Sequence, residues 1–311
     1  MTFALWISLL LCTGCIVLPA PGQSSRPADD YGDPKTVCQI TDRCLNEASG
    51  LVASRRNPGI YYTHNDSGGK PYVYALDRTG RIVTEIRLHD AENVDWEDIA
   101  IAPGETADTF DICAADIGDN NAKRKSVRIY RFPEPEIKLD EKSDTDSPAV
   151  IKVTPRVFRL KYVDGPRNAE GFVVEPTTGD GYVLDKREDG RCDVYRLAAP
   201  WNEKDTTTIQ RAGGLTFPPA LPLATMVTGA DLSPDGRRLV TRSYPSGWEW
   251  RLPSDVSKPD FLQLIVQTPT SLNLAPERQG EGICYSADGQ SILTISEGTP
   301  TALHEIRREK P

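Results

Sequence analysis

A short phrase recurs five times along the 311-residue chain and constrains its fold more than any other feature. Each copy has an acidic residue, then a small residue or glycine, then an apolar run with strand character, and successive copies lie 50, 73, 61 and 50 residues apart. Repeats with periods in this range are typical of β-propellers, whose units are small antiparallel sheets. The acidic members of the phrase are Glu47, Glu97, Glu170, Asp231 and Glu281.

Further strand-like segments follow each copy, because apolar and polar residues alternate and the runs end in turn-forming residues. The expected strands are 59–65, 72–76, 82–88, 111–117, 127–132, 150–162, 181–185, 193–197, 206–213, 238–244, 248–252, 261–267, 291–296 and 302–307. The last unit lacks one outer strand, and we expect residues 36–41 to supply it and so remove an exposed edge. The predicted fold is therefore an all-β propeller of five four-stranded blades closed by an N-terminal strand, with six blades as the alternative.

An apolar run over residues 3–19 predicts export, since its uninterrupted part is too short to span a membrane but suits a signal peptide. Residues 12–15 resemble a lipobox, which would place a lipid on Cys15, whereas the small residues at 20–22 suit ordinary cleavage. We expect a signal peptide or lipoprotein signal at 1–22, a polar tether at 23–35 and the propeller domain at 36–311. The mature protein is then extracytoplasmic: periplasmic, anchored to the membrane by its lipid, or secreted.

The cysteines and the charge narrow the chemistry further. Cys38 and Cys44 are close enough in sequence for a disulfide, which an exported protein can form. Three others sit in apolar runs and are expected to be buried free thiols: Cys113, Cys192 and Cys284. The net charge of −9, without a cluster of Lys and Arg, argues against nucleic-acid binding.

Strand direction predicts where polar residues gather. In an antiparallel blade, the start of the first strand and the end of the second lie on the same face. The five acidic residues should therefore meet a second polar set at one mouth of the central channel. That set comprises His64, Asn65, Asp66, Asp116, Asp119, Asn120, Lys186, Arg187, Arg242, Tyr244 and Glu297.

Carboxylates around one mouth repel each other, and a bound cation would remove the repulsion. All the candidate ligands offer oxygen, so a hard cation fits, with calcium ahead of magnesium because it accepts several carboxylates in flexible geometry. Alternatively, the acids bond to neighbouring backbone amides or form salt bridges with Lys186, Arg187 and Arg242. Beside a cation, the same basic residues would favour an anionic ligand such as a phosphate.

Several phrases together resemble those of a family of exported bacterial propellers that has no established activity. They are Glu47-Ala-Ser-Gly-Leu, His64-Asn-Asp-Ser-Gly, Asp95-Trp-Glu-Asp-Ile-Ala, Asp116-Ile-Gly-Asp-Asn, Val227-Thr-Gly-Ala-Asp-Leu-Ser-Pro-Asp-Gly and Gln279-Gly-Glu-Gly-Ile, spread over residues 45–300. The ring of acidic residues is also distantly similar to calcium-centred five-bladed apyrases and to phytase-like and lactonase-like propellers. This likeness implies a calcium site but matches none of their catalytic residues.

Two classes of function follow. The first is a calcium-dependent hydrolase that acts on a phosphate ester or a similar small anion at the mouth. The second is a non-catalytic propeller with a salt-bridged channel that binds a surface protein or glycan. In both cases we expect a monomer that meets the membrane only through an N-terminal lipid. Motifs for a nucleophilic serine, a zinc protease, a phosphate-binding loop or a dinucleotide site do not occur in the sequence.

Overall fold

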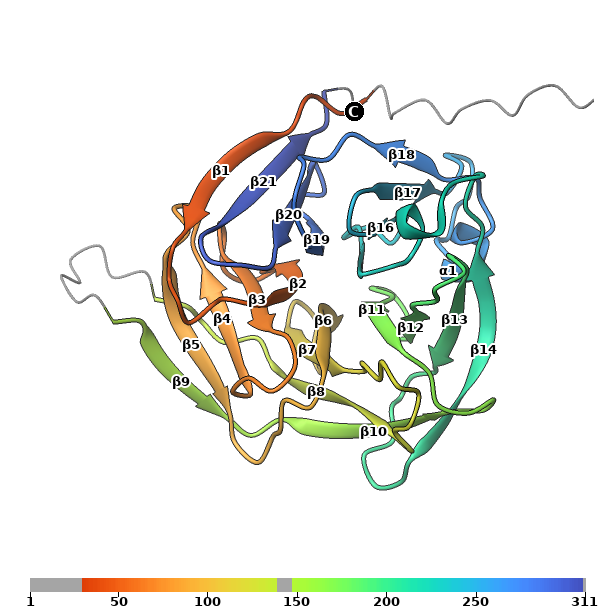
Figure 1. Ribbon diagram of the computed structural model, residues 1–311. Helices are drawn as coiled ribbons and strands as arrows, with labels where there is room; N and C mark the ends of the chain where they lie inside the picture. Colours follow the sequence, from red (N-terminus) through yellow and green to blue (C-terminus); the bar gives the residue numbers. More distant parts are fainter. Residues whose placement is uncertain (1–29, 139–146, 310–311) are drawn as a thin grey trace, which may run out of the picture.

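The computed structural model describes residues 30–138 and 147–309, so the predicted signal segment, Cys15 and part of the loop after residue 133 lie outside the described residues. The described chain is almost entirely β-structure, and its sheets stand around a central axis as in a propeller (Figure 1). No helix in these residues is long and apolar enough to cross a membrane.

Each sheet begins with a strand beside the axis and continues outwards (Figure 1). The first comprises β2 (Ala48–Ala53), β3 (Tyr61–Asn65), β4 (Tyr72–Leu76), β5 (Ile82–Leu88) and β9 (Ala149–Val153). The next group comprises β6 (Trp96–Pro103), β7 (Phe110–Asp116), β8 (Val127–Pro133) and β10 (Arg156–Tyr162). Through parallel pairing of β10 with β14 it continues into β11 (Ala169–Val174), β12 (Gly181–Asp185), β13 (Cys192–Leu197) and β14 (Thr207–Leu215).

Two four-stranded sheets complete the ring. One comprises β15 (Gly229–Leu232), β16 (Arg238–Arg242), β17 (Gly247–Arg251) and β18 (Thr270–Leu272). The other comprises β19 (Gly280–Tyr285), β20 (Ser291–Ser296), β21 (Thr301–Arg307) and β1 (Lys35–Ile40). The inner strands contact one another in the cyclic order β2, β6, β11, β15, β19 and back to β2.

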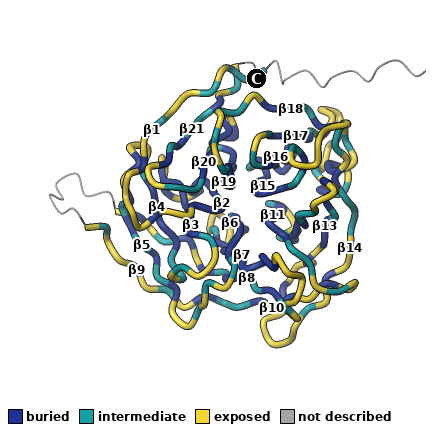
Figure 2. Tube along the Cα trace, in the orientation of Figure 1, coloured by how far each residue is buried: buried dark blue, intermediate teal, exposed yellow. Residues whose placement is uncertain are grey.

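The burial pattern explains why the inner strands differ in sequence from the outer ones. All six residues of β2 are buried, whereas β5 alternates between buried and partly exposed residues (Figure 2). An inner strand is covered on both faces by its neighbours, so apart from the acidic residue of the repeated phrase and its neighbour Asp98 it carries mainly small and apolar residues. An outer strand has one wet face and shows period-two alternation.

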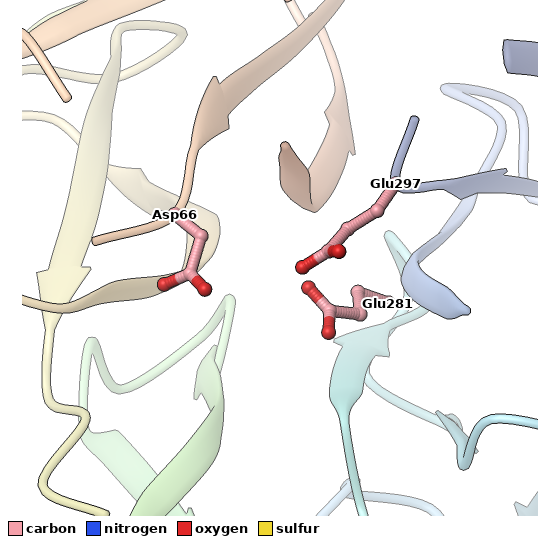
Figure 3. Close-up of side chains that lie close together, drawn as sticks. All are labelled: Asp66, Glu281 and Glu297. Atoms are coloured by element: carbon pink, nitrogen blue, oxygen red, sulfur yellow. The ribbon is translucent and has the colours of Figure 1, made fainter. Parts of the chain in front are cut away.

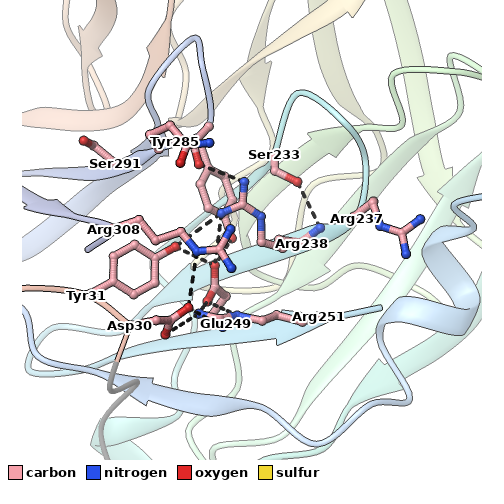
Figure 4. A network of polar contacts seen from close by, with 12 residues as sticks. Asp30, Tyr31, Ser233, Arg237, Arg238, Glu249, Arg251, Tyr285, Ser291 and Arg308 are labelled. Atoms are coloured by element: carbon pink, nitrogen blue, oxygen red, sulfur yellow. Dashed lines mark hydrogen bonds and ion pairs between the residues drawn. The ribbon is translucent and has the colours of Figure 1, made fainter. Parts of the chain in front are cut away.

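The predicted N-terminal strand is confirmed, because β1 pairs antiparallel with β21 from the other end of the chain. The two residues before β1, Asp30 and Tyr31, also bond to side chains of the last two sheets (Figure 4). Asp30 accepts hydrogen bonds from Arg251 at 2.6 Å and 3.0 Å and from Arg308 at 3.2 Å, and the Tyr31 hydroxyl donates to Glu249 at 2.9 Å. Chain ends thus join the β15–β18 sheet to the β19–β21 sheet.

Two predicted strands are wrong in detail. Segment 150–162 is two strands, because Pro155 interrupts the ladder. Its first half, β9, pairs in parallel with β5 of the preceding sheet, and only the second half, β10, pairs with β8. Segment 261–267 contains the short helix α1 (Phe261–Leu264), which begins where the Asp260 side chain accepts a hydrogen bond from the Gln263 amide.

The predicted disulfide is also wrong, since Cys38 and Cys44 are both free thiols. Cys38 lies in β1 against β21, while Cys44 lies in the exposed loop that follows β1. The short sequence separation between them therefore does not bring the two sulfurs together. The three remaining predictions are confirmed, because Cys113, Cys192 and Cys284 are free and buried.

Candidate functional site: an acidic channel mouth

Three of the predicted acidic residues occupy the same special position in their sheets. Glu97, Glu170 and Glu281 each lie where the register between the first and second strands shifts by one residue. Such a β-bulge turns an extra side chain out of the regular alternation. Each bulge lies at the start of an inner strand, so the three carboxyl groups are directed to one end of the channel.

Five carboxylates form two overlapping groups at this end, which we call the acidic mouth. Ligand oxygens of Asp66, Glu281 and Glu297 lie within 4.8 Å of one another, and those of Asp66, Asp95 and Glu97 form a second such group. Figure 3 shows the carboxyl groups of Asp66, Glu281 and Glu297 pointing toward each other; Glu281 lies in β19, and Asp66 and Glu297 directly follow β3 and β20. Asp66 belongs to both groups and therefore links them.

Burial makes this crowding electrostatically unfavourable. Glu97 and Glu281 are each only 4% exposed. Burial, together with the neighbouring Glu297, raises the pKa of Glu281 to about 9. Burial, followed by repulsion from Glu170, raises the pKa of Glu97 well above its ordinary value. Without a cation, Glu281 therefore holds a proton at neutral pH, and Glu97 is shifted in the same direction.

The partly exposed members of the mouth are affected less. Burial raises the pKa of Asp66 to about 6, with further contributions from Glu297 and Glu47. Burial and the nearby Asp66 likewise raise the pKa of Asp95 to about 6. Both carboxyl groups are therefore mainly ionised at neutral pH, and Asp66 faces the protonated Glu281.

The basic side chain of Lys186 enters the mouth. Lys186 Nζ donates hydrogen bonds to Glu170 Oε1 at 2.6 Å, Glu170 Oε2 at 2.7 Å and the Tyr244 hydroxyl at 2.8 Å. Lys186 and Tyr244, both predicted as ligand-binding residues at the mouth, thus lie beside Glu170, and Lys186 forms the salt bridge of the alternative interpretation. In the described part of the chain, Glu97 and Glu281 form no ion pair with any Lys or Arg.

Asp231 does not belong to the acidic mouth, which corrects one predicted ligand. Strand β15 pairs with β16 without a register shift, so the chain has no bulge to turn Asp231 toward the mouth. Its Oδ1 accepts a hydrogen bond from Leu232 N at 2.9 Å and its Oδ2 one from Tyr285 N at 2.8 Å. Asp231 therefore connects β15 to β19. This agrees with the alternative interpretation, in which the acidic residues bond to neighbouring backbone amides.

The two predicted arginine ligands are directed elsewhere. Arg242 is buried and pairs with Glu277 at 2.7 Å, and its guanidinium also donates to the Gly282 and Ile295 carbonyls. Arg187 pairs with Asp189 and Asp193 in the turn before β13 and within that strand. Neither guanidinium forms a salt bridge with the acidic ring, so the all-salt-bridge alternative applies to Glu170 alone.

Two predicted ligand-binding residues in β3, His64 and Asn65, hold the fold together and do not face the mouth as ligands. His64 is fully buried with its ring edge-on to Trp96 at 5.4 Å between centroids, and burial lowers its pKa to about 4, so it stays neutral. The side chain of Asn65 accepts hydrogen bonds from Asn46 N and Glu47 N and donates to Cys44 O. Asn65 thus holds the loop that carries the exposed Glu47 at the rim.

The predicted set after β7 also shapes the rim without joining the mouth. Asp116 is buried and pairs with Arg124 at 2.7 Å, and Asp119 accepts hydrogen bonds from the backbone amides of Lys123 and Arg124. Asn120 accepts a hydrogen bond from Asn168 Nδ2 at 3.1 Å. These contacts fix the loop between β7 and β8.

The sequence analysis missed two residues of the site, Asp95 and Gly118, and one buried carboxylate, Asp98, that connects inner strands. Asp95 belongs to the mouth, and the Asp-Trp-Glu-Asp phrase offered it as a second acid beside Glu97. Gly118 leaves room for both, because a Cβ there would overlap the carboxyl groups of Glu97 and Asp95. Like Asp231, Asp98 connects inner strands: it accepts hydrogen bonds from Phe172 N at 2.8 Å and Ala230 N at 3.2 Å.

No family model and no curated protein sequence matches this chain. The chain is similar to the PQQ-bound form of aldose sugar dehydrogenase from Streptomyces coelicolor, with 12% identity, a TM-score of 0.47 and coverage of 91% of this chain and 99% of that chain. It is also similar to Myxococcus xanthus glutaminyl cyclase, with 11% identity, a TM-score of 0.45 and coverage of 88% and 95%. Likeness at this level carries no inference about function.

Proposed function

We propose that the protein is a five-bladed propeller that binds a divalent cation, calcium, at the acidic mouth. The closed cyclic order of five inner strands supports five blades over six. One observation carries the cation site: Glu97 and Glu281 are buried beside Asp66 without a basic partner among the described residues. Buried carboxylates are ordinarily paired or bound to metal, because an unpaired buried charge is costly.

The donor set fits calcium. It consists of carboxylate oxygens, with no sulfur and no imidazole, and calcium takes six to eight oxygen ligands in flexible geometry. Glu281 Oε2 is buried and receives no hydrogen bond from any donor in the described residues. We propose that Asp66 is a ligand common to both groups, with Glu281 and Glu297 on one side of it and Asp95 and Glu97 on the other.

Two side chains at the rim support the proposal that the protein also binds an anionic ligand there. Lys186 and Tyr244 lie beside Glu170, so an anion on the open side would meet an ammonium and a phenolic hydroxyl. A bound cation would supply charge stabilisation to a phosphoryl or carboxyl oxygen. Within this proposal, the finer hypothesis is hydrolysis of a phosphate ester, and the second candidate is binding of an anionic group on a surface protein or glycan without turnover.

Titration calorimetry tests the cation site. Calcium should bind the purified protein and release protons at pH 7, because Glu281 must give up its proton to become a ligand. Glu281→Gln and Glu97→Gln should weaken binding and reduce the proton release. Glu136→Gln is the matched control, since the Glu136 side chain is 64% exposed and pairs only with Arg56.

Two further results separate the hypotheses. If calcium and magnesium produce no heat, no proton release and no change in melting temperature, the cation site is wrong. If calcium binds but p-nitrophenyl phosphate is not hydrolysed faster than by Glu97→Gln, the hydrolase hypothesis fails and the binding function remains. Lys186→Met should then weaken binding of inorganic phosphate to the calcium-loaded protein.

A further inference from the structure

A cavity of about 520 Å³ lies at the opposite end of the channel from the acidic mouth. Its walls come from the ends of the inner strands and from the turns that follow them. They include Ala100 and Ala102 of β6, Val174 of β11 and Leu232 of β15, and the β6–β7 turn over residues 103–110 forms one side. This volume lies within the range of pockets that bind small organic molecules.

Arg55, just after β2, brings an unusual feature to this cavity. No described residue accepts a hydrogen bond from its guanidinium, and its Nη1 is buried. Arg55 as a whole is partly exposed, whereas the two buried arginines among the described residues are both bonded, Arg242 to Glu277 and Arg238 to the carbonyl of Gly289. A guanidinium offers five donors in a planar fork that matches a carboxylate, so an unpaired one facing a cavity is suited to a ligand.

Asp231 lies near enough to Arg55 for the guanidinium to counter the effect of burial on the pKa of Asp231, but no acidic residue around the cavity accepts a hydrogen bond from Arg55 among the described residues. Both oxygens of Asp231 already accept backbone hydrogen bonds from Leu232 and Tyr285. Glu105 forms an exposed pair with Arg156 at 3.4 Å, and Asp108 lies exposed in the β6–β7 turn. The remaining wall is largely aliphatic, which favours a ligand with an apolar body over a small inorganic anion.

We propose that this cavity binds a small organic monocarboxylate, with the carboxylate on Arg55 and the apolar body against Ala100, Ala102, Val174 and Leu232. The acidic mouth takes no part in this site, because it lies at the other end of the inner strands. The site is therefore distinct from the cation site in both position and chemistry.

Calorimetry or ligand-observed NMR on the whole protein, in the presence of a chelator, tests the proposal without the cation site. The probes are benzoate and hexanoate, with benzamide and hexanamide as neutral counterparts and inorganic phosphate as an anion without an apolar body. We expect the two carboxylates to bind more tightly than their amides and than phosphate. Arg55→Met should weaken carboxylate binding about 10- to 100-fold, the range of one charge-assisted interaction.

Arg56→Met is the matched control, because the neighbouring Arg56 pairs with exposed Glu136 and does not line the cavity. It should leave carboxylate binding unchanged, and Arg55→Lys should retain part of it because it keeps the charge but loses the fork. A melting curve for each variant shows that it is folded, and Arg55→Lys provides the test if Arg55→Met does not fold. Equal affinity for benzoate and benzamide, unchanged benzoate binding in the Arg55 variants, or no binding of either carboxylate would each overturn the proposal.

Discussion

Replacing Glu281 with glutamine should stabilise the protein at neutral pH when no cation is present. The pKa of Glu281 rises from its ordinary value of 4.5 to about 9 in the folded protein, with burial as the largest cause. A carboxyl group with a raised pKa contributes fully to stability below pH 4.5, and that contribution is lost as the pH rises toward 9. Between these values the folded protein holds a proton that the unfolded chain releases.

The size of the effect follows from the shift. Each pH unit in this window costs about 1.4 kcal/mol, so the roughly 2.5 units from pH 4.5 to 7 cost about 3.5 kcal/mol of unfolding free energy. Glutamine keeps the shape of the side chain and does not titrate. Glu281→Gln should therefore raise the melting temperature at pH 7 in chelator by roughly 5–7 °C, given an unfolding entropy of about 2.1 cal/mol/K per residue.

Thermal and urea unfolding from pH 5 to 9 provides the assay, with Glu136→Gln as the surface control. The difference between Glu281→Gln and wild type should grow with pH and be smallest near pH 5. Calcium at about a thousandfold excess over Kd should reverse the order, because it adds about 4.1 kcal/mol to the wild type, which exceeds the roughly 3.5 kcal/mol advantage of a variant that binds calcium weakly. If Glu281→Gln is less stable than wild type at pH 7 in chelator, Glu281 makes a favourable contact and the electrostatic reasoning is wrong.

The remaining predictions concern other parts of the chain. Arg242→Met should lower the unfolding free energy by about 3–5 kcal/mol, because it leaves Glu277 buried without its partner, whereas Arg187→Met, at an exposed pair, should cost about 1 kcal/mol or less in the same urea titration. Cys44 should react with a maleimide in the native protein without a reductant, and a lack of reaction that a reductant restores would indicate that it is disulfide-bonded after all. Mass analysis of protein from the native host should show loss of at least residues 1–14, and an intact amino terminus would contradict export.

Local pattern was sufficient to predict most strands. The segments 72–76, 82–88, 181–185 and 291–296 have the bounds of β4, β5, β12 and β20. Side-chain alternation and turn residues act over a few residues, so they can be read from the chain alone. The pairing of β1 with β21 was also predictable, because a unit with a missing outer strand leaves an edge that some other strand must cover.

The composition of the acidic mouth could be predicted only in part. Glu97, Glu170 and Glu281 reach it because their strands carry bulges, whereas Asp231 begins an equally acidic phrase but pairs without one. A bulge depends on how two strands align, and that alignment is a property of the pair. The one-residue difference between Asp98 and Glu97 separates a carboxylate that bonds to backbone amides from a mouth carboxylate for the same reason.

The partners of the arginine side chains depend on which residues the fold brings together from distant parts of the chain. Arg242 and Arg187 carry the same charge at corresponding strand ends, yet one meets Glu277 and the other meets Asp189. The unpaired guanidinium of Arg55 likewise follows from what the other strands leave beside it. A sequence specifies which groups can ionise or donate, but their pKa values and partners depend on burial and distance, which arise only when residues far apart in the chain are packed together.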